Sequence, residues 1–168
     1  MRKTLTGRIR ALGFSLFPAY FGTGAHLSYI SDDWRHAEVV LPLTLRTRNY
    51  RGTIFGGSIY GAVDPLYMVM LIKCLGPEYS VWDKAASIRF LKPGKGTLRA
   101  VLALSEDELA VIRAEAAEGR PIDREYVIEL ADATGKVSAR VEKTIYIRKL
   151  RASQPNEAVG AASSAASR

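Results

Sequence analysis

The sequence contains a single cysteine, Cys74, and only two histidines. One cysteine excludes a disulfide within the chain, and these three side chains are too few for a zinc cluster unless carboxylates supply most of the ligands. We therefore expect no structural metal. Hydrophobic residues make up 48% and charged residues 24% of the 168 residues, proportions that exclude both a disordered chain and a disulfide-stapled scaffold. This length is typical of one domain.

Acidic residues are also scarce relative to basic ones, 17 against 24, which gives a formal net charge of +7 and favours anionic partners. The basic residues are spread along the chain and do not form one run. No RNA-recognition motif, basic zipper or zinc-finger spacing is present. The sequence therefore argues against nucleic acid as a partner and favours a compact anion such as a nucleotide diphosphate.

Residues 1–24 form a separate N-terminal segment in which basic residues precede an apolar stretch. Pro18 interrupts that stretch and no small-residue cleavage site follows, so we expect a part of the mature protein and not a secretory signal. Large apolar side chains fall on one face of a predicted helix: Leu5, Ile9, Leu12 and Leu16. We expect this face to pack on the domain. The alternative is peripheral contact of residues 1–21 with an anionic membrane.

Residues 25–150 carry the main domain. Apolar and polar residues alternate in several segments, which is typical of half-buried strands: 37–47, 82–90, 98–104, 126–130 and 137–147. Turn residues separate them, so we predict a mainly antiparallel sheet with one covered face. Residues 106–118 predict a short helix between two late strands. Residues 151–168 are rich in Ala and Ser, and we expect a disordered tail without function.

The segment Gly56–Leu75 breaks the alternation, because large apolar residues occur on nearly every side of the helix it predicts. A central helix wrapped by the sheet explains this better than a membrane span, since Asp64 and Pro65 lie inside it. Asp64 is the only acid of this helix. A carboxylate in apolar surroundings is a candidate site residue, and the alternative is an aspartate that simply ends a helix before proline.

Gly56 and Gly57 open this helix, where free backbone amides favour a developing negative charge. Asp64 lies seven residues beyond Gly57, roughly 10 Å along a helix axis. One copy of the helix cannot easily place both features at one reacting carbonyl. Two antiparallel copies could, so the spacing suggests a twofold homodimer.

Two stretches of the sequence, Asn49–Asp64 and Ile88–Pro93, carry a family resemblance. The first resembles the motif of phenylacetyl-CoA-type acyl-CoA thioesterases, which has an asparagine, then His-Gly-Gly, then a helix aspartate. The second resembles the strand that follows in that family. The resemblance implies an α+β hotdog fold, in which a curved antiparallel sheet wraps one long central helix. It is closest to a poorly characterised, thioesterase-like branch of the superfamily.

The resemblance implies that Asp64 is the general base or nucleophile in thioester hydrolysis. It also implies that the amide of Gly56, with Gly57, polarises the thioester carbonyl and that Asn49 orients the water or acyl group. Phe55 stands where the family usually has histidine, and Pro65 directly after the aspartate is unusual. These two departures motivate an alternative function, an acyl-CoA or fatty-acyl binding protein without turnover.

Four basic residues near the motif could bind the phosphates of coenzyme A, with solvated surface as the alternative for each: Arg48, Arg51, Arg89 and Lys92. Coenzyme A would be part of the substrate, and we expect no other cofactor and no metal. The expected assembly is a homodimer or a tetramer, and the expected location is cytoplasmic. His26, His36 and Cys74 are assigned no catalytic role.

Overall fold

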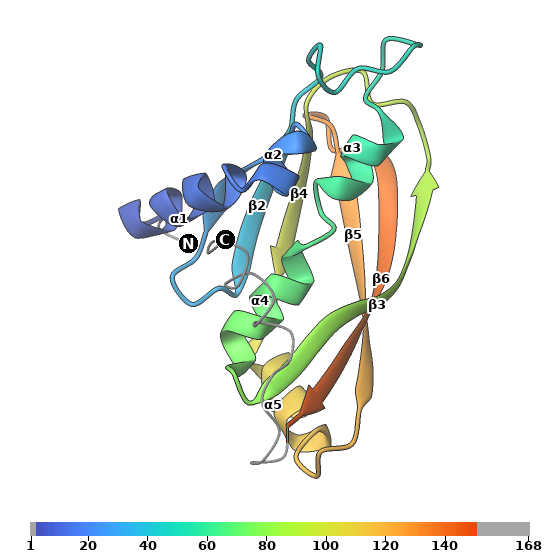
Figure 1. Ribbon diagram of the computed structural model, residues 1–168. Coiled ribbons are helices and arrows are strands. Elements are labelled where there is room, and N and C mark those ends of the chain that lie inside the picture. The colour runs from blue at the N-terminus through green and yellow to red at the C-terminus, as the bar shows by residue number, and fades with distance from the viewer. Residues whose placement is uncertain (1–2, 151–168) are drawn as a thin grey trace, which may run out of the picture.

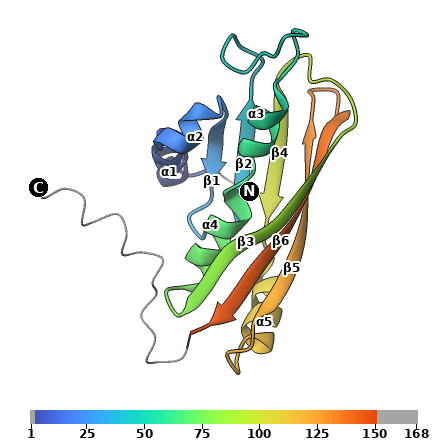
Figure 2. The ribbon, with the colours of Figure 1, turned by 45° about the vertical axis from the view of Figure 1, so that its right-hand side comes forward.

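A six-stranded antiparallel sheet curves around a central helical segment, and two N-terminal helices pack beside its first strand (Figures 1 and 2). The computed structural model describes residues 3–150, so the predicted tail at 151–168 lies outside the described residues. The strand order is β1-β2-β4-β5-β6-β3. The strands are β1 His26–Ile30, β2 His36–Leu41, β3 Tyr79–Phe90, β4 Leu98–Ala103, β5 Ile122–Ala131 and β6 Val137–Lys149. The helices are α1 Leu5–Ser15, α2 Pro18–Gly22, α3 Gly56–Gly61, α4 Leu66–Leu75 and α5 Glu106–Glu115.

This arrangement is the hotdog fold, and the α+β prediction is confirmed. Alternation places one side of each inner strand in the core, as Leu98, Ala100 and Leu102 show in β4. The predicted strand over 37–47 is wrong at its end, because β2 stops at Leu41, directly before Pro42. Proline cannot donate to a strand ladder, so the residues that follow form a loop in which Leu45 is exposed.

The predicted helix over residues 106–118 is present as α5, between β4 and β5. Ser105 caps it by accepting a hydrogen bond from the Glu108 amide at 3.0 Å. Leu109 and Ile112 lie on its buried face and join the core of the sheet. The local sequence signals and the packing agree over this element.

The central segment, predicted as one helix over Gly56–Leu75, consists of α3 and α4 joined by a turn at Ala62–Pro65. By length and composition this segment could cross a membrane, but in the fold it is the core helix inside the sheet, as predicted. The break follows from Pro65, which has no amide hydrogen for the carbonyl one turn earlier. The position of Asp64 is therefore in a turn and not within a regular helix.

The face of α1 that packs on the domain differs from the prediction. Gly7, Ala11 and Ser15 are buried, whereas Leu5, Ile9, Leu12 and Leu16 are 59–74% exposed. Small residues occupy the buried face because α1 lies very close to β1. A Cβ on Gly7 would stand 2.4 Å from the Ile30 carbonyl oxygen and from the Tyr29 ring. The large apolar stripe is left facing outward.

Candidate functional site

The turn at Ala62–Pro65 frees backbone carbonyls that side chains from other elements then satisfy. The Tyr20 hydroxyl of α2 donates to the Ala62 carbonyl at 2.9 Å. The Lys143 ammonium of β6 donates to the Asp64 carbonyl. Because buried carbonyls need donors, these two contacts fix the broken turn against α2 on one side and the sheet on the other.

Lys143 is the centre of a buried charged cluster. Its side chain is 0% exposed, and its Nζ lies 3.2 Å from Asp64 Oδ1 and 2.8 Å from Asp83 Oδ1. The Asp64 and Asp83 side chains are 43% and 25% exposed. A fully buried ammonium is costly unless it is paired and hydrogen-bonded, and here two carboxylates and a carbonyl surround it. Apart from this ion pair, Asp83 Oδ1 has no polar partner among the described residues.

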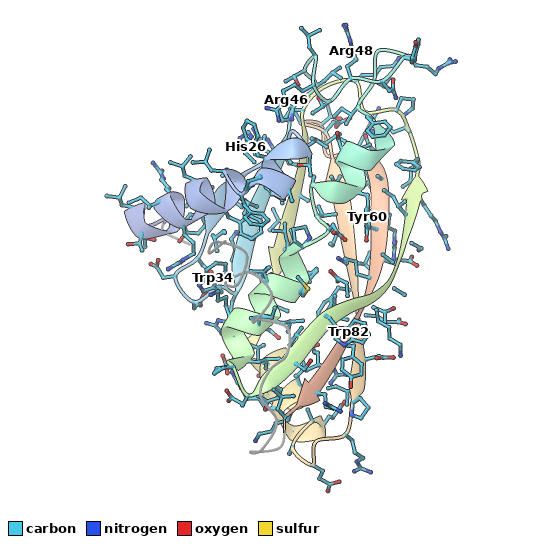
Figure 3. The ribbon with its side chains drawn as sticks, viewed as in Figure 1. His26, Trp34, Arg46, Arg48, Tyr60 and Trp82 are labelled. Carbon is cyan, nitrogen blue, oxygen red and sulfur yellow. The ribbon has the colours of Figure 1, made fainter. Side chains whose placement is uncertain are left out.

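Tyr60 completes the surroundings of Asp64. Figure 3 shows Tyr60 at the level of the helix break, and its ring centroid is 5.9 Å from Lys143 Nζ. Partial burial, and then hydrogen bonding to Asp64, raises the pKa of Tyr60 above its ordinary value. The phenol is therefore protonated near neutral pH.

Asp83 is the less exposed carboxylate of the cluster. Burial raises the pKa of Asp83 above the ordinary carboxyl value, although the nearby Lys143 opposes that rise. Asp83 is on β3, next to a bulge between Asp83 and Ala85 in the pairing with β6. The irregular register places this side chain at the cluster.

Lys143, Asp83 and Tyr60 were not predicted as site residues. A signal for Lys143 is present, because it occupies an inward position of β6 between Val141 and Ile145, both fully buried. A lysine at that place in an otherwise apolar series predicts a paired buried charge. Tyr60 lies four residues before Asp64, a spacing that places two side chains on one helix face. The bulge that positions Asp83 has no comparable sequence signal.

An apolar cavity of about 540 Å³ lies between the N-terminal helices and the helix break. Phe14, Phe17 and Tyr20 line it from the N-terminal side, and Asp64 and Met68 line it from the central segment. Among the described residues that line it, Asp64 is the only charged one. The predicted aspartate therefore stands where an apolar cavity and a buried ion pair meet.

A second cavity, of about 460 Å³, brings together three of the other seven predicted residues. Asn49, Gly56 and Lys92 line it together with Phe90, but Asp64 does not. Within one chain, the predicted base and the predicted amide donor thus face different cavities. This separation matches the sequence argument that one copy of the helix does not supply both.

The side chain of Asn49 is occupied within its own loop. Its Nδ2 donates to Thr53 Oγ1 at 3.0 Å, and its Oδ1 accepts from the amides of Arg51 and Thr53 at 2.9 and 3.1 Å. These bonds hold the loop that leads into α3. Gly57 has a similarly local constraint, because a Cβ there would stand 2.4 Å from the ring of Phe55.

The four basic residues predicted for coenzyme A are dispersed. Lys92 lines the second cavity and pairs with Asp132 at 3.1 Å. Arg48 and Arg51 are exposed in the loop before α3, and Arg89 is exposed on β3. Figure 3 places Arg48 at the end of the molecule that carries this loop. One of the four therefore reaches a cavity, and the other three lie on the surface around it.

The cysteine and the two histidines lie outside the Lys143 cluster. Among residues 3–150, no group of three or more His, Cys, Asp or Glu side chains is placed to hold a metal ion. Burial raises the pKa of the Cys74 thiol, which disfavours a reactive thiolate. His26 is exposed on β1, and His36 lies 3.4 Å from Glu38 on β2.

Replacing Lys143 by methionine should destabilise the fold, since it removes the cation while keeping most of the side-chain volume. Breaking a buried ion pair in this way costs about 3 kcal/mol, the lower end of the usual range because both carboxylates retain some solvent. Urea unfolding measures the change. The matched control is Lys95→Met at an exposed position, which should change the free energy of unfolding by less than about 0.5 kcal/mol.

The loss in Lys143→Met should depend on pH. Burial raises the pKa of Asp83, and removing the cation raises it further. An acid with a raised pKa in the folded state favours folding below its unfolded pKa, and this benefit is lost as pH rises through the folded value. The variant should therefore lose most stability near neutral pH and less near pH 4. A loss that grows on acidification would contradict the assigned cluster.

Comparisons with known proteins agree with this fold. A probable thioesterase of unknown function from Pseudomonas aeruginosa is similar, with a TM-score of 0.74, 18% identity, and coverage of 88% of this chain and 97% of that one. A thioesterase from Haemophilus influenzae has a TM-score of 0.63 and 16% identity, and the match covers 88% of this chain and 94% of that one. The PaaI protein of the phenylacetic acid degradation operon of E. coli has a TM-score of 0.57 and 15% identity, and the match covers 86% of this chain and 91% of that one.

At these identities the solved structures establish the fold alone. No curated protein matches the sequence. A sequence family described as a domain of unknown function, DUF4442, matches residues 8–147, which is most of the chain. The chain belongs to the DUF4442 family, with the hotdog fold of thioesterase-like proteins.

Proposed function

We propose that this protein hydrolyses acyl thioesters, with Asp64 activating the attacking water or acting as the nucleophile. The observation that carries the proposal is the Asp64 carboxylate itself, which is partly exposed, held by a fully buried lysine, and placed at the edge of an apolar cavity. A general base needs a fixed orientation and access to its substrate, and this arrangement supplies both. The thioesterase-like fold supports the same conclusion.

In the proposed reaction, water adds to the thioester carbonyl carbon while Asp64 accepts a proton from that water. The oxyanion that forms is stabilised by backbone amides at the start of α3 in a second copy of the chain, those of Gly56 and Gly57. The carbon–sulfur bond then breaks, the thiolate leaves and takes up the proton, and a free carboxylic acid remains. Lys143 and Tyr60 hold Asp64 in place, and Asn49 holds the loop that presents the Gly56 amide.

The proposal includes a twofold homodimer formed through β3. This strand has twelve residues and lies at one edge of the sheet, with small exposed residues at its middle, Ala85, Ala86 and Ser87. An open edge of this length favours pairing with another strand. Antiparallel pairing centred on Ala86 would bring Asp83 of one copy level with Arg89 of the other, since both are three residues from that centre.

Such pairing would place the Asp64 cluster of one copy beside the Gly56 cavity of the other, because Phe90 follows Arg89 and lines that cavity. It would also bring Arg89 toward the site, where it could meet a coenzyme A phosphate. Lys92, Arg48 and Arg51 would extend the basic rim. The carrier is coenzyme A or an acyl-carrier protein in this proposal, and the reaction takes place in the cytoplasm.

The exposed apolar stripe of α1 supports a proposed peripheral contact with an anionic membrane. The stripe continues into Phe17 and Phe21, both exposed. Arg8 on α1 is exposed, and Arg46 stacks on the Phe21 ring at 4.3 Å. Apolar side chains beside cations suit a surface of anionic lipid. The same segment lines the apolar cavity, so a membrane there would lie close to the route to Asp64.

Replacing Asp64 by asparagine should reduce the release of free thiol from acyl-CoA substrates by at least about a hundredfold, the lower range for loss of a general base. Thiol release is followed with a chromogenic thiol reagent over several acyl groups. Asp107→Asn, at an exposed carboxylate on α5, is the control and should retain activity. Equal turnover by native protein and Asp64→Asn would exclude this role.

A native protein that binds acyl-CoA saturably but releases no thiol would support the alternative, a binding protein without turnover. Phe55, at the position where the thioesterases that this motif resembles usually have histidine, favours that alternative.

An acidic residue at the proposed strand pairing should weaken the dimer, because twofold symmetry would place two like charges together. Ala86→Asp should shift the mass measured by sedimentation equilibrium toward the monomer, without loss of folded structure. Val127→Asp, on the exposed face of the inner strand β5, is the control and should leave the mass unchanged. A native protein that is monomeric at all concentrations would exclude the two-copy site.

Leu12→Glu should abolish co-sedimentation with anionic phospholipid vesicles, since it places a charge in the middle of the exposed stripe. Ala110→Glu on the exposed side of α5 should leave sedimentation unchanged. Equal sedimentation of both variants would rule out this membrane contact. A changed oligomeric mass in Leu12→Glu would assign the stripe to a second copy of the chain instead.

A further inference from the structure

The cavity between the N-terminal helices and the central segment has an almost wholly apolar wall. Phe14, Phe17 and Met68 contribute large carbon surfaces. The polar atoms that belong to lining residues are occupied: the Tyr20 hydroxyl donates to the Ala62 carbonyl, and the Thr23 hydroxyl donates to the Tyr20 carbonyl at 2.7 Å. A cavity of this kind favours an apolar occupant, because its wall offers water few partners.

Two proline bends and a glycine shape the cavity. Pro18 separates α1 from α2, and Pro65 breaks the central segment, so that two bends face each other across the space. Gly13 and Gly61 line the wall, and a Cβ on Gly13 would meet no atom within 4 Å. The absence of a side chain at Gly13 leaves room along the wall, whereas the Thr23 side chain already fills the space beside Gly61.

The cavity has a charged group, Asp64, at one end and apolar side chains at the other. Asp64 lies at the helix break, where it reaches the Lys143 cluster, whereas the exposed ring of Phe17 lies at the side of the N-terminal helices. A ligand that is polar at one end and hydrocarbon along the rest would match this distribution. An acyl thioester is such a molecule, with its carbonyl at one end of an alkyl chain.

We infer that this cavity binds the alkyl chain of a fatty-acyl thioester, with the thioester carbonyl next to Asp64. The inference rests on the proposed thioester hydrolysis and names its substrate class, a flexible hydrocarbon chain as opposed to an aromatic acyl group. Met68 and the two phenylalanines can adjust their side chains around such a chain. The N-terminal helices then set how much chain the protein accepts.

Binding of S-(2-oxoalkyl)-CoA thioethers tests the inference in the intact protein. These analogues keep the carbonyl but have a methylene between it and the sulfur, so they cannot be hydrolysed. For a series of increasing saturated chain length, the affinity should rise about three- to fourfold per methylene until the cavity is full, as expected for burial of each group. The corresponding thioether analogue of phenylacetyl-CoA is the competing probe and should bind more weakly than the analogues with longer alkyl chains. Affinity that does not depend on chain length, or tightest binding of the phenylacetyl probe, would overturn the inference.

Two variants that fill the cavity locate the site. Gly13→Leu and Met68→Trp should shift the preferred chain to a shorter length and leave the affinity for the shortest chain within about twofold. Ala110→Leu, on the exposed side of α5, is the matched control and should keep the native length profile. Equal weakening of all chains, or no change in either cavity variant, would place the chain elsewhere.

The binding series separates this inference from the proposed function. Chain-dependent binding without any thiol release would leave the cavity assigned and exclude hydrolysis. Thiol release from thioesters with no dependence on chain length in either binding or turnover would leave hydrolysis and exclude the cavity as the acyl site. Measuring thioether binding and thioester turnover on the same preparation distinguishes these results.

Discussion

The buried ammonium of Lys143 is the constraint on which the site depends. A lysine side chain with no exposed surface requires compensating charge and hydrogen bonds within reach of a single nitrogen atom. Asp64 and Asp83 supply the charge, and the carbonyl of Asp64 accepts a hydrogen bond. One cation thereby ties the central turn, β3 and β6 together, and fixes the carboxylate that is the candidate base.

The break at Pro65 makes that arrangement compatible with the fold. In an unbroken helix the carbonyls of Ala62 and Asp64 would bond within the helix, whereas here Tyr20 and Lys143 satisfy them. The same break separates α3 from α4 and creates space beside the N-terminal helices. An unusual proline after the aspartate is thus explained by the contacts it allows, and it does not by itself argue for a lost site.

Much of the fold could be predicted, because alternation in β4, β5 and β6 follows directly from a sheet with one covered face. The site could be predicted only in part. Asp64 is visible as a lone acid in an apolar helix, but its partner Lys143 lies 79 residues away and becomes its neighbour only through the sheet. The packing of α1 could not be read from its apolar stripe, since close approach to β1 selects Gly7 and not the large side chains.

A double-mutant cycle between Asp64→Asn and Lys143→Met tests the central claim most directly. If the ion pair organises the turn, the two changes in unfolding free energy should be strongly non-additive, with a coupling of about 1–3 kcal/mol, as expected for residues in contact. Additive effects at neutral pH, within about 0.5 kcal/mol, would contradict the account, because Lys143 would then be stabilised without Asp64.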